Sequence, residues 1–359
     1  MFGISNFINI VTGDIAIDLG TANTLIWIKG QGIVLNEPSI VARNVVNGEI
    51  IAVGDEANEM VGRTHSGIET LRPLKDGVIA DYKMTDAMIL GFIRKIKLSR
   101  IARPRIVICI PSGVTDVEQR SVKESAEHAN ASEVYLIEEP MAAAIGIGID
   151  VSKPVGNMIV DIGGGTTEIA VISLNGIGTI ETIRIAGDEQ TKAIVDWFKE
   201  QHKLGIGERT AENIKCTVGS AVRSSGNKIA VKGQDLITGI PKTMEVSSDE
   251  IRQAMAETVF QITSAIKNAL DKTPPEHSSD IIDFGIILTG GGALLKDMDV
   301  HIRSKTNLPV NVSEDPLFTV VKGTGIVLEN LKKYKDVLIQ PCWRAPEFHS
   351  SIKMFWLFY

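Results

Sequence analysis

The sequence predicts an α/β protein built from two like-folded lobes. Short β-branched runs alternate along the chain with longer stretches of helical periodicity, a pattern typical of α/β architecture. The chain also contains an internal repeat, because residues 15–28 (IAIDLGTANTLIWI) align with residues 158–171 (MIVDIGGGTTEIAV). In both segments a hydrophobic strand ends in Asp, a turn rich in Gly or Thr follows, and a second strand leaves. We therefore expect two related domains whose turns face each other.

The expected strands are short apolar runs with glycine or proline nearby. They are residues 15–19, 24–28, 105–110, 134–137, 157–162, 168–172 and 284–290. Two stretches between them have helical character. Thr115 and Glu118 have the spacing of a capping box, which predicts a helix from Thr115 to Ala129. Residues 249–270 carry apolar side chains at helical spacing and form the second expected helix.

Three segments are predicted to lie between or beside these elements. Residues 152–157 (SKPVGN) separate the two halves of the chain, and residues 271–280 (DKTPPEHSSD) are predicted to be a loop. Residues 38–81 form a small insertion with few long periodic segments.

Composition narrows the class of protein. A chain of 359 residues predicts about two domains. The net charge of -7 and pI near 5.5 argue against nucleic-acid binding by a general basic field. The three cysteines form no CxxC pair, so neither a zinc site nor a disulfide framework is expected. No apolar run approaches the ~18 residues of a membrane span, and the N-terminus lacks the features of a signal peptide.

The two turns have the chemistry of phosphate binding. Each offers closely spaced backbone N–H groups, and glycine permits near approach by an anion. Asp18 and Asp161 would repel a bare phosphate, so their predicted role is to hold Mg²⁺ through water. Further hydrogen-bond donors are expected from the hydroxyls of Thr21, Thr24, Thr166 and Thr167.

A third glycine cluster, Gly290 to Gly292, follows the strand at 284–290. Its glycines would let a flat base or a ribose lie against the backbone at a helix start, and a tight strand-to-helix turn is the less favoured alternative. The chain has neither a Walker A motif nor GxGxxG, so the expected nucleotide site is neither a P-loop nor a Rossmann site.

Hydrolysis of a nucleotide needs a positioned water molecule. Glu138 and Glu139 precede Pro140 at the start of a helix of small residues, where a carboxylate can orient or deprotonate water. Acids at a helix N-terminus also compensate the helix dipole, and the residues alone leave both explanations open.

Together these motifs resemble the actin, Hsp70 and sugar-kinase superfamily and, within it, the MreB family. The resemblance covers residues 14–338 and rests on DIAIDLGTANTLIWIKGQGIVLNEPS, RPLKDGVIADY, IEEPMAAAIG, VDIGGGTTEIAVISLNG and LTGGGALL. It implies an actin-like ATPase fold of two duplicated ribonuclease H-like lobes, each with a smaller subdomain, and ATP with Mg²⁺ in the interdomain cleft. The implied divisions are 1–13 (membrane-binding segment), 14–152 plus 319–340 (lobe I, small subdomain about 35–75), 153–318 (lobe II, small subdomain about 187–250) and 341–359 (atypical tail).

The resemblance also implies roles for individual residues. The first phosphate turn comprises Thr21, Ala22 and Asn23, and the second comprises Gly163, Gly164, Gly165 and Thr166. Ribose and base would be contacted by Glu212 and Lys215, with Gly290, Gly291, Gly292 and Ala293 on the adenine side. Glu139 resembles the carboxylate that positions water, with Thr166 as its helper, and Glu138 is the weaker candidate.

The implied function is slow, Mg-dependent ATP hydrolysis that regulates assembly into filaments on the inner face of the cytoplasmic membrane. Such filaments organise cell-wall synthesis and maintain rod shape, with MreC, MreD and RodZ-like membrane proteins as partners and no role for nucleic acid. Two alternatives share the fold. A small-molecule kinase needs polar substrate contacts for which the sequence offers no convincing set, and an Hsp70-like chaperone needs a further peptide-binding domain.

The chain departs from the family pattern in two places. Ala186 and Thr191 stand where MreB chains usually have Gly and Asp, close to the expected nucleotide edge, so nucleotide affinity or turnover is expected to differ. The C-terminal segment 342–359, whose residues 343–359 are rich in aromatic side chains, matches nothing in the family. We expect it to pack on the surface or stay disordered, with anchoring in a membrane interface as the alternative.

The N-terminus is the predicted membrane anchor. If residues 2–12 form a helix, Ile4, Phe7, Ile8 and Val11 lie on one apolar stripe. No basic residue flanks this segment before Lys29, so attraction to lipid must come from apolar burial. An apolar loop around Leu98 and Ile101 is expected to assist.

Overall fold

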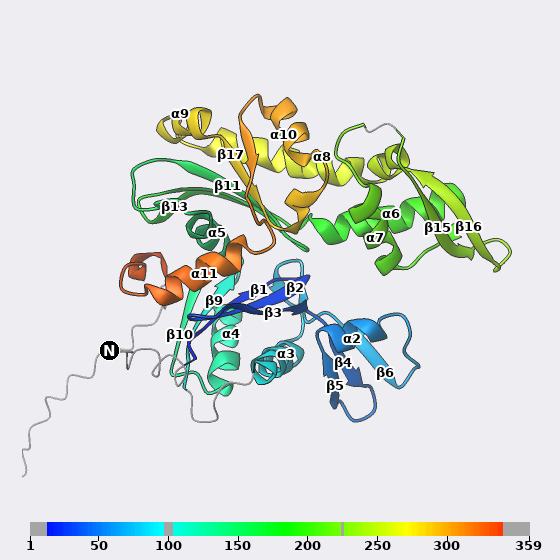
Figure 1. The fold of residues 1–359 in the computed structure, drawn as a ribbon, viewed down its shortest axis with the longest axis horizontal. Helices are drawn as coiled ribbons and strands as arrows, with labels where there is room; N and C mark the ends of the chain where they lie inside the picture. The colour runs from blue at the N-terminus through cyan, green and yellow to red at the C-terminus, as the bar shows by residue number, and fades with distance from the viewer. Residues whose placement is uncertain (1–12, 97–102, 224–225, 340–359) are drawn as a thin grey trace, which may run out of the picture.

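The computed structural model describes residues 13–96, 103–223 and 226–339, and it is organised around two five-stranded sheets (Figure 1). The first sheet has the order β10-β9-β1-β2-β3. Strand β1 pairs antiparallel with β2 and parallel with β9, and β9 is parallel to β10. Its strands are β1 (Ile15–Leu19), β2 (Asn23–Ile28), β3 (Gly32–Pro38), β9 (Arg105–Ile110) and β10 (Glu133–Glu138).

The second sheet repeats this topology with the order β13-β12-β11-β17-β18. Strand β11 is antiparallel to β12 and parallel to β17, as β1 is to β2 and β9. The duplication predicted from the sequence is therefore confirmed in the pairing of the strands. The members are β11 (Asn157–Ile162), β12 (Thr167–Ser173), β13 (Gly176–Ile183), β17 (Ile286–Thr289) and β18 (Val310–Val312).

A small sheet extends from each large one, and both lie on the same side of the molecule (Figure 1). The first consists of β4 (Val41–Asn44), β5 (Ile50–Val53) and β6 (Ile68–Leu71), with α2 (Asp55–Met60) beside it. The second consists of β14 (Leu204–Gly205), β15 (Lys228–Asp235) and β16 (Pro241–Ser247). A two-stranded ribbon, β7 (Leu74–Lys75) and β8 (Val78–Ile79), leads from the first small sheet back to the first large one.

Helices cover the outer faces of the large sheets. The first sheet is covered by α3 (Tyr82–Lys95) and α4 (Asp116–His128). Thr115 caps α4 in the predicted capping box with Glu118, and so confirms the predicted start of this helix. The second sheet is covered by α8 (Ser248–Lys272), α9 (Pro275–Phe284) and α10 (Met298–Thr306). Helices α6 (Gly187–His202) and α7 (Glu208–Val218) pack against α8 and the second small sheet.

The prediction of a loop over residues 271–280 was wrong. Helix α8 continues to Lys272, and α9 begins at Pro275 after a short break. Proline fits the first turn of a helix because its missing N–H group would have no partner inside the helix there. The Pro274–Pro275 pair therefore marks the start of a helix rather than the middle of a loop.

Two helices lie between the large sheets (Figure 1): α5 (Glu139–Ile147) and α11 (Thr319–Glu329). They cross at two glycines, because a Cβ on Gly146 would lie 2.0 Å from the Thr319 carbonyl oxygen and one on Gly323 would lie 1.8 Å from that of Ala142. The backbones touch at this crossing. The chain passes from the first sheet to the second after α5 and returns through α11. Both connections between the sheets therefore run through the crossing of these two helices.

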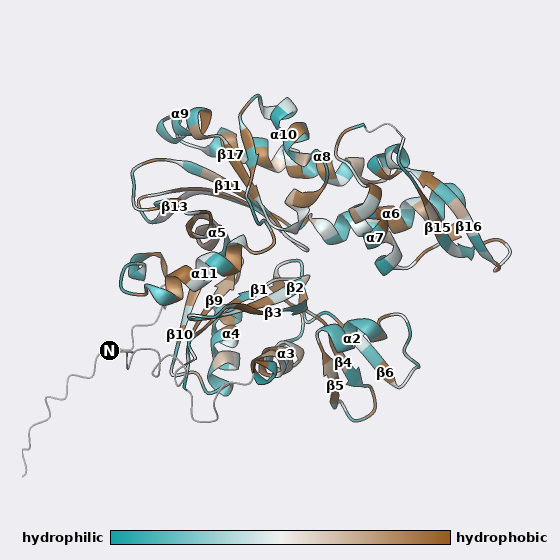
Figure 2. Ribbon diagram, in the orientation of Figure 1, coloured by the Kyte–Doolittle hydropathy of each residue, from teal (hydrophilic) through white to brown (hydrophobic). Residues whose placement is uncertain are grey.

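Three large apolar clusters form the core, and a fourth, small one lies at the first small sheet. One lies under each sheet, and the third joins both sheets to α5 and α11 through residues such as Ala16, Val107, Ile159 and Ala170. Figure 2 shows hydrophobic residues in the central strands of both sheets. The shared cluster buries apolar surface from both halves, which stabilises their association.

The expected N-terminal anchor (Ile4, Phe7, Ile8 and Val11), the loop at Leu98 and Ile101 and the aromatic tail lie outside the described residues. Within the described part of the chain, no helix has the length and apolar character needed to cross a membrane.

Candidate functional site

The turns that follow the two Asp-containing strands, β1 and β11, meet each other. A Cβ on Gly164 would lie 2.7 Å from the Ala22 Cβ, and one on Gly165 would lie 3.0 Å from the Thr21 side chain and from the Asp76 backbone nitrogen. A side chain at Gly164 would therefore push the turns apart, and one at Gly165 would require its neighbours to move. Glycine is required at this position for close approach rather than for an unusual backbone angle.

The second turn is supported by the start of α6. The Gly163 nitrogen donates to the Thr166 carbonyl oxygen at 2.9 Å, which closes the turn. The nitrogens of Gly187 and Asp188, in the first turn of α6, donate to the carbonyl oxygens of Gly163 and Gly164 at 3.2 and 2.8 Å. These bonds hold the second turn against the positive end of the helix dipole.

Buried carboxyl groups gather behind the turns. Asp18, Asp161 and Glu168 are only 8, 6 and 1 % exposed. Burial raises the pKa of Asp161 to about 7, and burial together with the negative charge of Asp161 raises the pKa of Asp18 to about 7. Burial likewise raises the pKa of Glu168 to about 8. Such a group of acids ionises readily only when a cation is near.

The third glycine cluster lies against Asp161. A Cβ on Gly290 would lie 2.2 Å from Asp161 Oδ1, and Gly290 has a φ of 80°, which favours glycine. Gly291 to Leu294 form a 3-10 turn, η1, in which Gly292 packs on Ile162 and Ala293 is buried. The glycine cluster thus forms a turn after the strand that faces the end of β11, and its contact with a base or ribose stays a prediction.

Glu139 lies in the first turn of α5, as predicted. Burial and then the charge of Glu168 raise its pKa well above the ordinary value, with smaller effects from Asp18 and Asp161. Glu139 therefore belongs to the carboxyl cluster. Burial also raises the pKa of Glu138, whose strongest polar neighbour is instead Ser112. The two adjacent glutamates thus have different surroundings.

Thr166 stands at the end of the second turn, against the β7–β8 ribbon. A Cβ on Gly77 would lie 2.5 Å from Thr166 Cγ2 and 3.7 Å from Pro111. Asn23, at the corresponding place in the first turn, is exposed and donates to the Asn36 side chain at 3.3 Å. The two turns therefore end in different environments.

Glu212 and Lys215 come from α7 and form an ion pair at 2.7 Å. Lys215 Nζ also donates to the Gly187 carbonyl oxygen at 2.8 Å and to Thr191 Oγ1 at 3.0 Å, and Thr191 bonds Glu212. Thr191, one of the two departures from the family pattern, thus joins this network. Gly187 links the network to the second turn, but no described hydrogen bond joins Glu212 or Lys215 to Gly290–Ala293.

Three further residues lie at this site that had no predicted role. Arg72 Nη1 donates to the carbonyl oxygens of Thr21 and Ala22 at 3.4 and 3.3 Å. Glu168 joins the carboxyl cluster, and Ser112 hydrogen-bonds Glu168 from the other sheet. Glu168 lies in the repeated hairpin and Arg72 begins the motif RPLKDGVIADY, whereas no local pattern marks Ser112.

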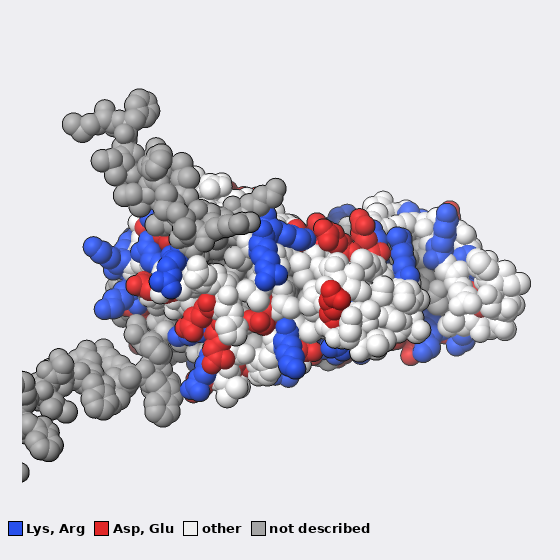
Figure 3. All heavy atoms as spheres, turned by 90° about the horizontal axis from the view of Figure 1, so that it is seen from below, with Lys and Arg blue, Asp and Glu red and all other residues white. Residues whose placement is uncertain are grey.

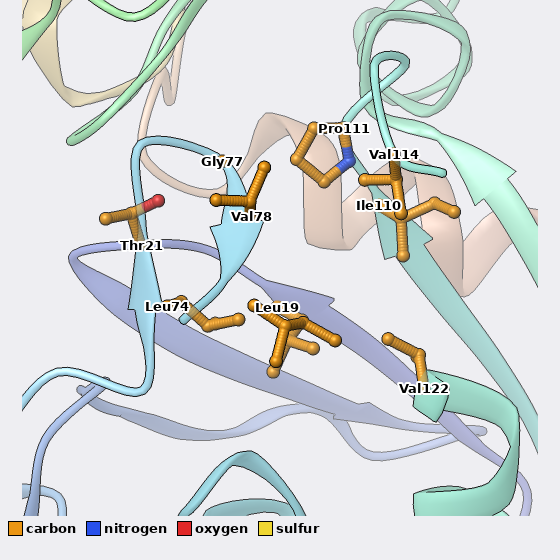
Figure 4. A pocket seen from close by; sticks show the side chains of 10 residues that line it. Leu19, Thr21, Leu74, Gly77, Val78, Ile110, Pro111, Val114 and Val122 are labelled. Carbon is orange, nitrogen blue, oxygen red and sulfur yellow. The ribbon is translucent and has the colours of Figure 1, made fainter. Parts of the chain in front are cut away.

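An apolar cavity of about 20 Å³ lies beside the first turn (Figure 4). Leu19, Leu74, Val78 and Val122 point into it, and Thr21 and Gly77 lie at its edge. It is too small for a nucleotide and has room for about one water molecule. Its apolar walls belong to the core that supports the first turn.

The duplicated sheets and the meeting of their turns define an actin-like fold. The crystal structure of MreB5 of Spiroplasma citri bound to AMPPNP is similar to this chain with a TM-score of 0.85 and 37 % identity, covering 90 % of this chain and 97 % of that one. The structure of the same protein bound to ADP gives a TM-score of 0.86 and 36 % identity, covering 91 and 99 %. The predicted fold class is confirmed.

The chain belongs to the MreB/Mbl family. The family model described as MreB/Mbl protein matches residues 12–336. The cell shape-determining protein Mbl of Bacillus subtilis (strain 168) is 49 % identical over 322 residues, which are 89 % of this chain and 97 % of the relative. The cell shape-determining protein MreB of Escherichia coli (strain K12) is 48 % identical over 333 residues, covering 91 and 96 %. The family resemblance found in the sequence is thus confirmed.

Proposed function

We propose that this chain is an ATP-dependent, polymerising cytoskeletal protein that determines cell shape. One observation carries the proposal: two matched turns meet beside the buried carboxyls of Asp18 and Asp161. Relatives nearly half identical to the chain are named cell shape-determining proteins, and the similar MreB5 structures hold AMPPNP or ADP.

The residues fit Mg-ATP. Glycine at 164, 165 and 290 leaves room where a Cβ would collide with the opposite turn or with Asp161. Buried acids cost free energy unless a cation or hydrogen-bond donor compensates them. Within the described residues, no three side chains of His, Cys, Asp or Glu converge as direct metal ligands. Mg²⁺ commonly keeps several waters and takes one or two carboxylates plus phosphate oxygens, a set that Asp18 and Asp161 can complete.

Bound Mg-ATP supplies the γ-phosphoryl group that water attacks. The N–H groups of Thr21, Ala22 and Asn23 and those of Gly163 to Thr166 would hold the phosphates from two sides. Glu139 would orient the attacking water and accept its proton, helped by the Thr166 hydroxyl. Glu212 and Lys215 would contact the ribose and base, opposite the 3-10 turn at Gly290–Ala293.

In this proposal slow hydrolysis times the life of a filament. ATP stabilises the arrangement of the two lobes that assembles, and ADP stabilises it less, so hydrolysis shifts the population away from assembly. The filament, rather than a released product, is then the output of the reaction.

The filament is proposed to lie on the inner face of the cytoplasmic membrane through Ile4, Phe7, Ile8 and Val11. The face in Figure 3 carries side chains of both signs interspersed, which agrees with attachment by apolar burial rather than by charge. One short segment binds weakly, and a filament presents many in a row, so membrane binding should depend on assembly. MreC, MreD and RodZ-like proteins are the proposed partners.

Sedimentation and liposome flotation with Mg-ATP test the proposal. The wild-type chain should pellet, release phosphate slowly and float with liposomes. Phe7→Asp combined with Ile8→Asp should pellet equally and fail to float. A wild-type chain that binds no ATP, or that phosphorylates a sugar without assembling, would overturn the proposed function. Floating of the double variant would overturn only the position of the anchor.

A further inference from the structure

A buried acid distinguishes the second hairpin from the first. Glu168 lies directly opposite Asp161 in the β11–β12 pairing, and Leu25 holds the equivalent place opposite Asp18. Glu168 and Leu25 are both buried, at 1 and 6 % exposure. Leucine needs no partner there, whereas a buried carboxyl is costly without hydrogen bonds. Glu168 therefore calls for a partner that the first hairpin does not need.

That partner belongs to the other large sheet. Glu168 Oε1 accepts a hydrogen bond from the Ser112 backbone nitrogen at 3.0 Å, and Oε2 accepts one from Ser112 Oγ at 3.2 Å. Ser112 follows β9, the neighbour of β1. Among the described residues, these are the only hydrogen bonds of the Glu168 side chain. Both of its oxygens are thus used by one residue across the junction of the lobes.

The bridge lies next to the proposed water-positioning residue. Glu168 is the charged group with the largest effect on Glu139. Pro111, which precedes Ser112, lies beside Gly77 and so beside Thr166. Ser112 also acts on Glu138, whose pKa it lowers against the larger, raising effect of burial. A serine hydroxyl has a single proton to donate, so a bond to Glu168 holds Ser112 toward the second lobe and away from Glu138.

We propose that Glu168 is a positioning residue that latches the two lobes together through Ser112. The inference rests on the proposed function, and it adds a residue to the machinery of hydrolysis. Two hydrogen bonds to one carboxyl group fix both the distance and the angle of the opposite segment. The latch keeps Glu139, carried by the first lobe, aligned with the second turn and Thr166. Opening of the lobes breaks both bonds and removes Glu139 from its working position.

The test is a double-mutant cycle between the two residues. Glu168→Leu copies the residue of the first hairpin, keeps the volume of the side chain and removes both acceptors. Ser112→Ala removes the hydroxyl donor, and Ser112→Thr retains it. Glu181→Gln is the matched control, because Glu181 bonds Lys272 within its own lobe on the neighbouring strand.

Phosphate release at saturating Mg-ATP should slow about tenfold in Glu168→Leu and less in Ser112→Ala, consistent with the loss of two bonds or one. The double variant should be no slower than Glu168→Leu, because both changes break the same latch. The Kd for ATP should stay within about threefold, since the latch positions Glu139 rather than the nucleotide. Ser112→Thr and Glu181→Gln should match the wild type.

Additive effects, or Ser112→Thr as slow as Ser112→Ala, would overturn the latch. Hydrogen exchange at the Ser112 amide in nucleotide-free protein gives a second readout, which should quicken in Glu168→Leu and not in Glu181→Gln. This readout needs no ATP, so failure of the proposed function and failure of the latch remain distinguishable. An unchanged exchange rate in a folded Glu168→Leu variant would also reject the proposal.

Discussion

The two hairpins that carry Asp18 and Asp161 share the same strand pairing and differ in the side chains of their turns. The first turn carries side chains at Thr21 and Ala22, and the second has glycines at the aligned positions 164 and 165. Because one turn is bare, the other can lie directly against it. The duplication therefore supplies matched scaffolds, and the substitutions between the copies make the site asymmetric. The second hairpin supplies the glycines that permit the close contact, and it carries two of the buried acids, Asp161 and Glu168, whereas the first carries Asp18 alone.

The largest expected effect concerns hydrolysis on the side of the second hairpin. Glu139→Ala should slow phosphate release by roughly 10²-fold or more, a typical loss for a general base, while ATP binding and assembly persist. A phosphate-release assay beside sedimentation measures both. Glu138→Ala is the control, because burial and Ser112, rather than Asp18 or Asp161, determine the shift in the pKa of Glu138. If Glu138→Ala is the slower variant, the roles of the two glutamates are reversed.

The next effect compares the two aspartates. Asp161→Ala should weaken Mg-ATP binding by roughly 10²-fold, the upper range for residues that support a metal through its outer shell. Asp18→Ala should weaken it less, since Gly290 lies directly against Asp161. Titration of Mg-ATP with folded variants measures both losses. Equal losses would mean that the hairpins contribute symmetrically, and unchanged affinity in Asp161→Ala would remove it from the metal site.

The smallest effect is the pH dependence of stability without nucleotide. The pKa values near 7 for Asp18 and Asp161 and near 8 for Glu168 mean that the folded chain keeps protons that the unfolded chain releases near pH 4. Stability from these groups is complete below that pH and is lost as the pH rises through about 8. The Tm should fall by several degrees between pH 6 and 8.

Variants that cannot ionise sharpen the comparison. The second hairpin holds two of these acids and the first holds one, so Asp161→Asn combined with Glu168→Gln should flatten the profile of Tm against pH more than Asp18→Asn. A Tm that rises from pH 6 to 8 in the wild type, without Mg²⁺ or nucleotide, would contradict the raised pKa values.

Local patterns predicted most of the fold. The strands that carry Asp18 and Asp161 near their ends and the capping box at Thr115 depend on neighbouring residues, so the sequence could indicate them. The same locality placed Glu139 in the first turn of a helix. The helix at Pro275 was missed because a proline pair is compatible with both a loop and a helix start.

Contacts between distant segments could not be predicted in this way. Ser112 and Glu168 are separated by 56 positions, and their bond depends on how the lobes pack. The Thr191 hydroxyl could be identified as a departure from the family, but its bonds to Lys215 and Glu212 become visible only when α6 lies beside α7. The roles of these residues toward a nucleotide remain predictions.

The crossing of α5 and α11 at Gly146 and Gly323 has a mechanical consequence. Where backbones touch without intervening side chains, sliding of one helix along the other would force main-chain atoms together, so tilting is the easier motion. Both connections between the lobes run through this point, which makes it a fulcrum. The small sheets lie far from this crossing on one side of the molecule (Figure 1), so a rotation at the crossing moves them further than it moves the residues nearby. A slight tilt at two glycines is thereby magnified into a large displacement at the tips.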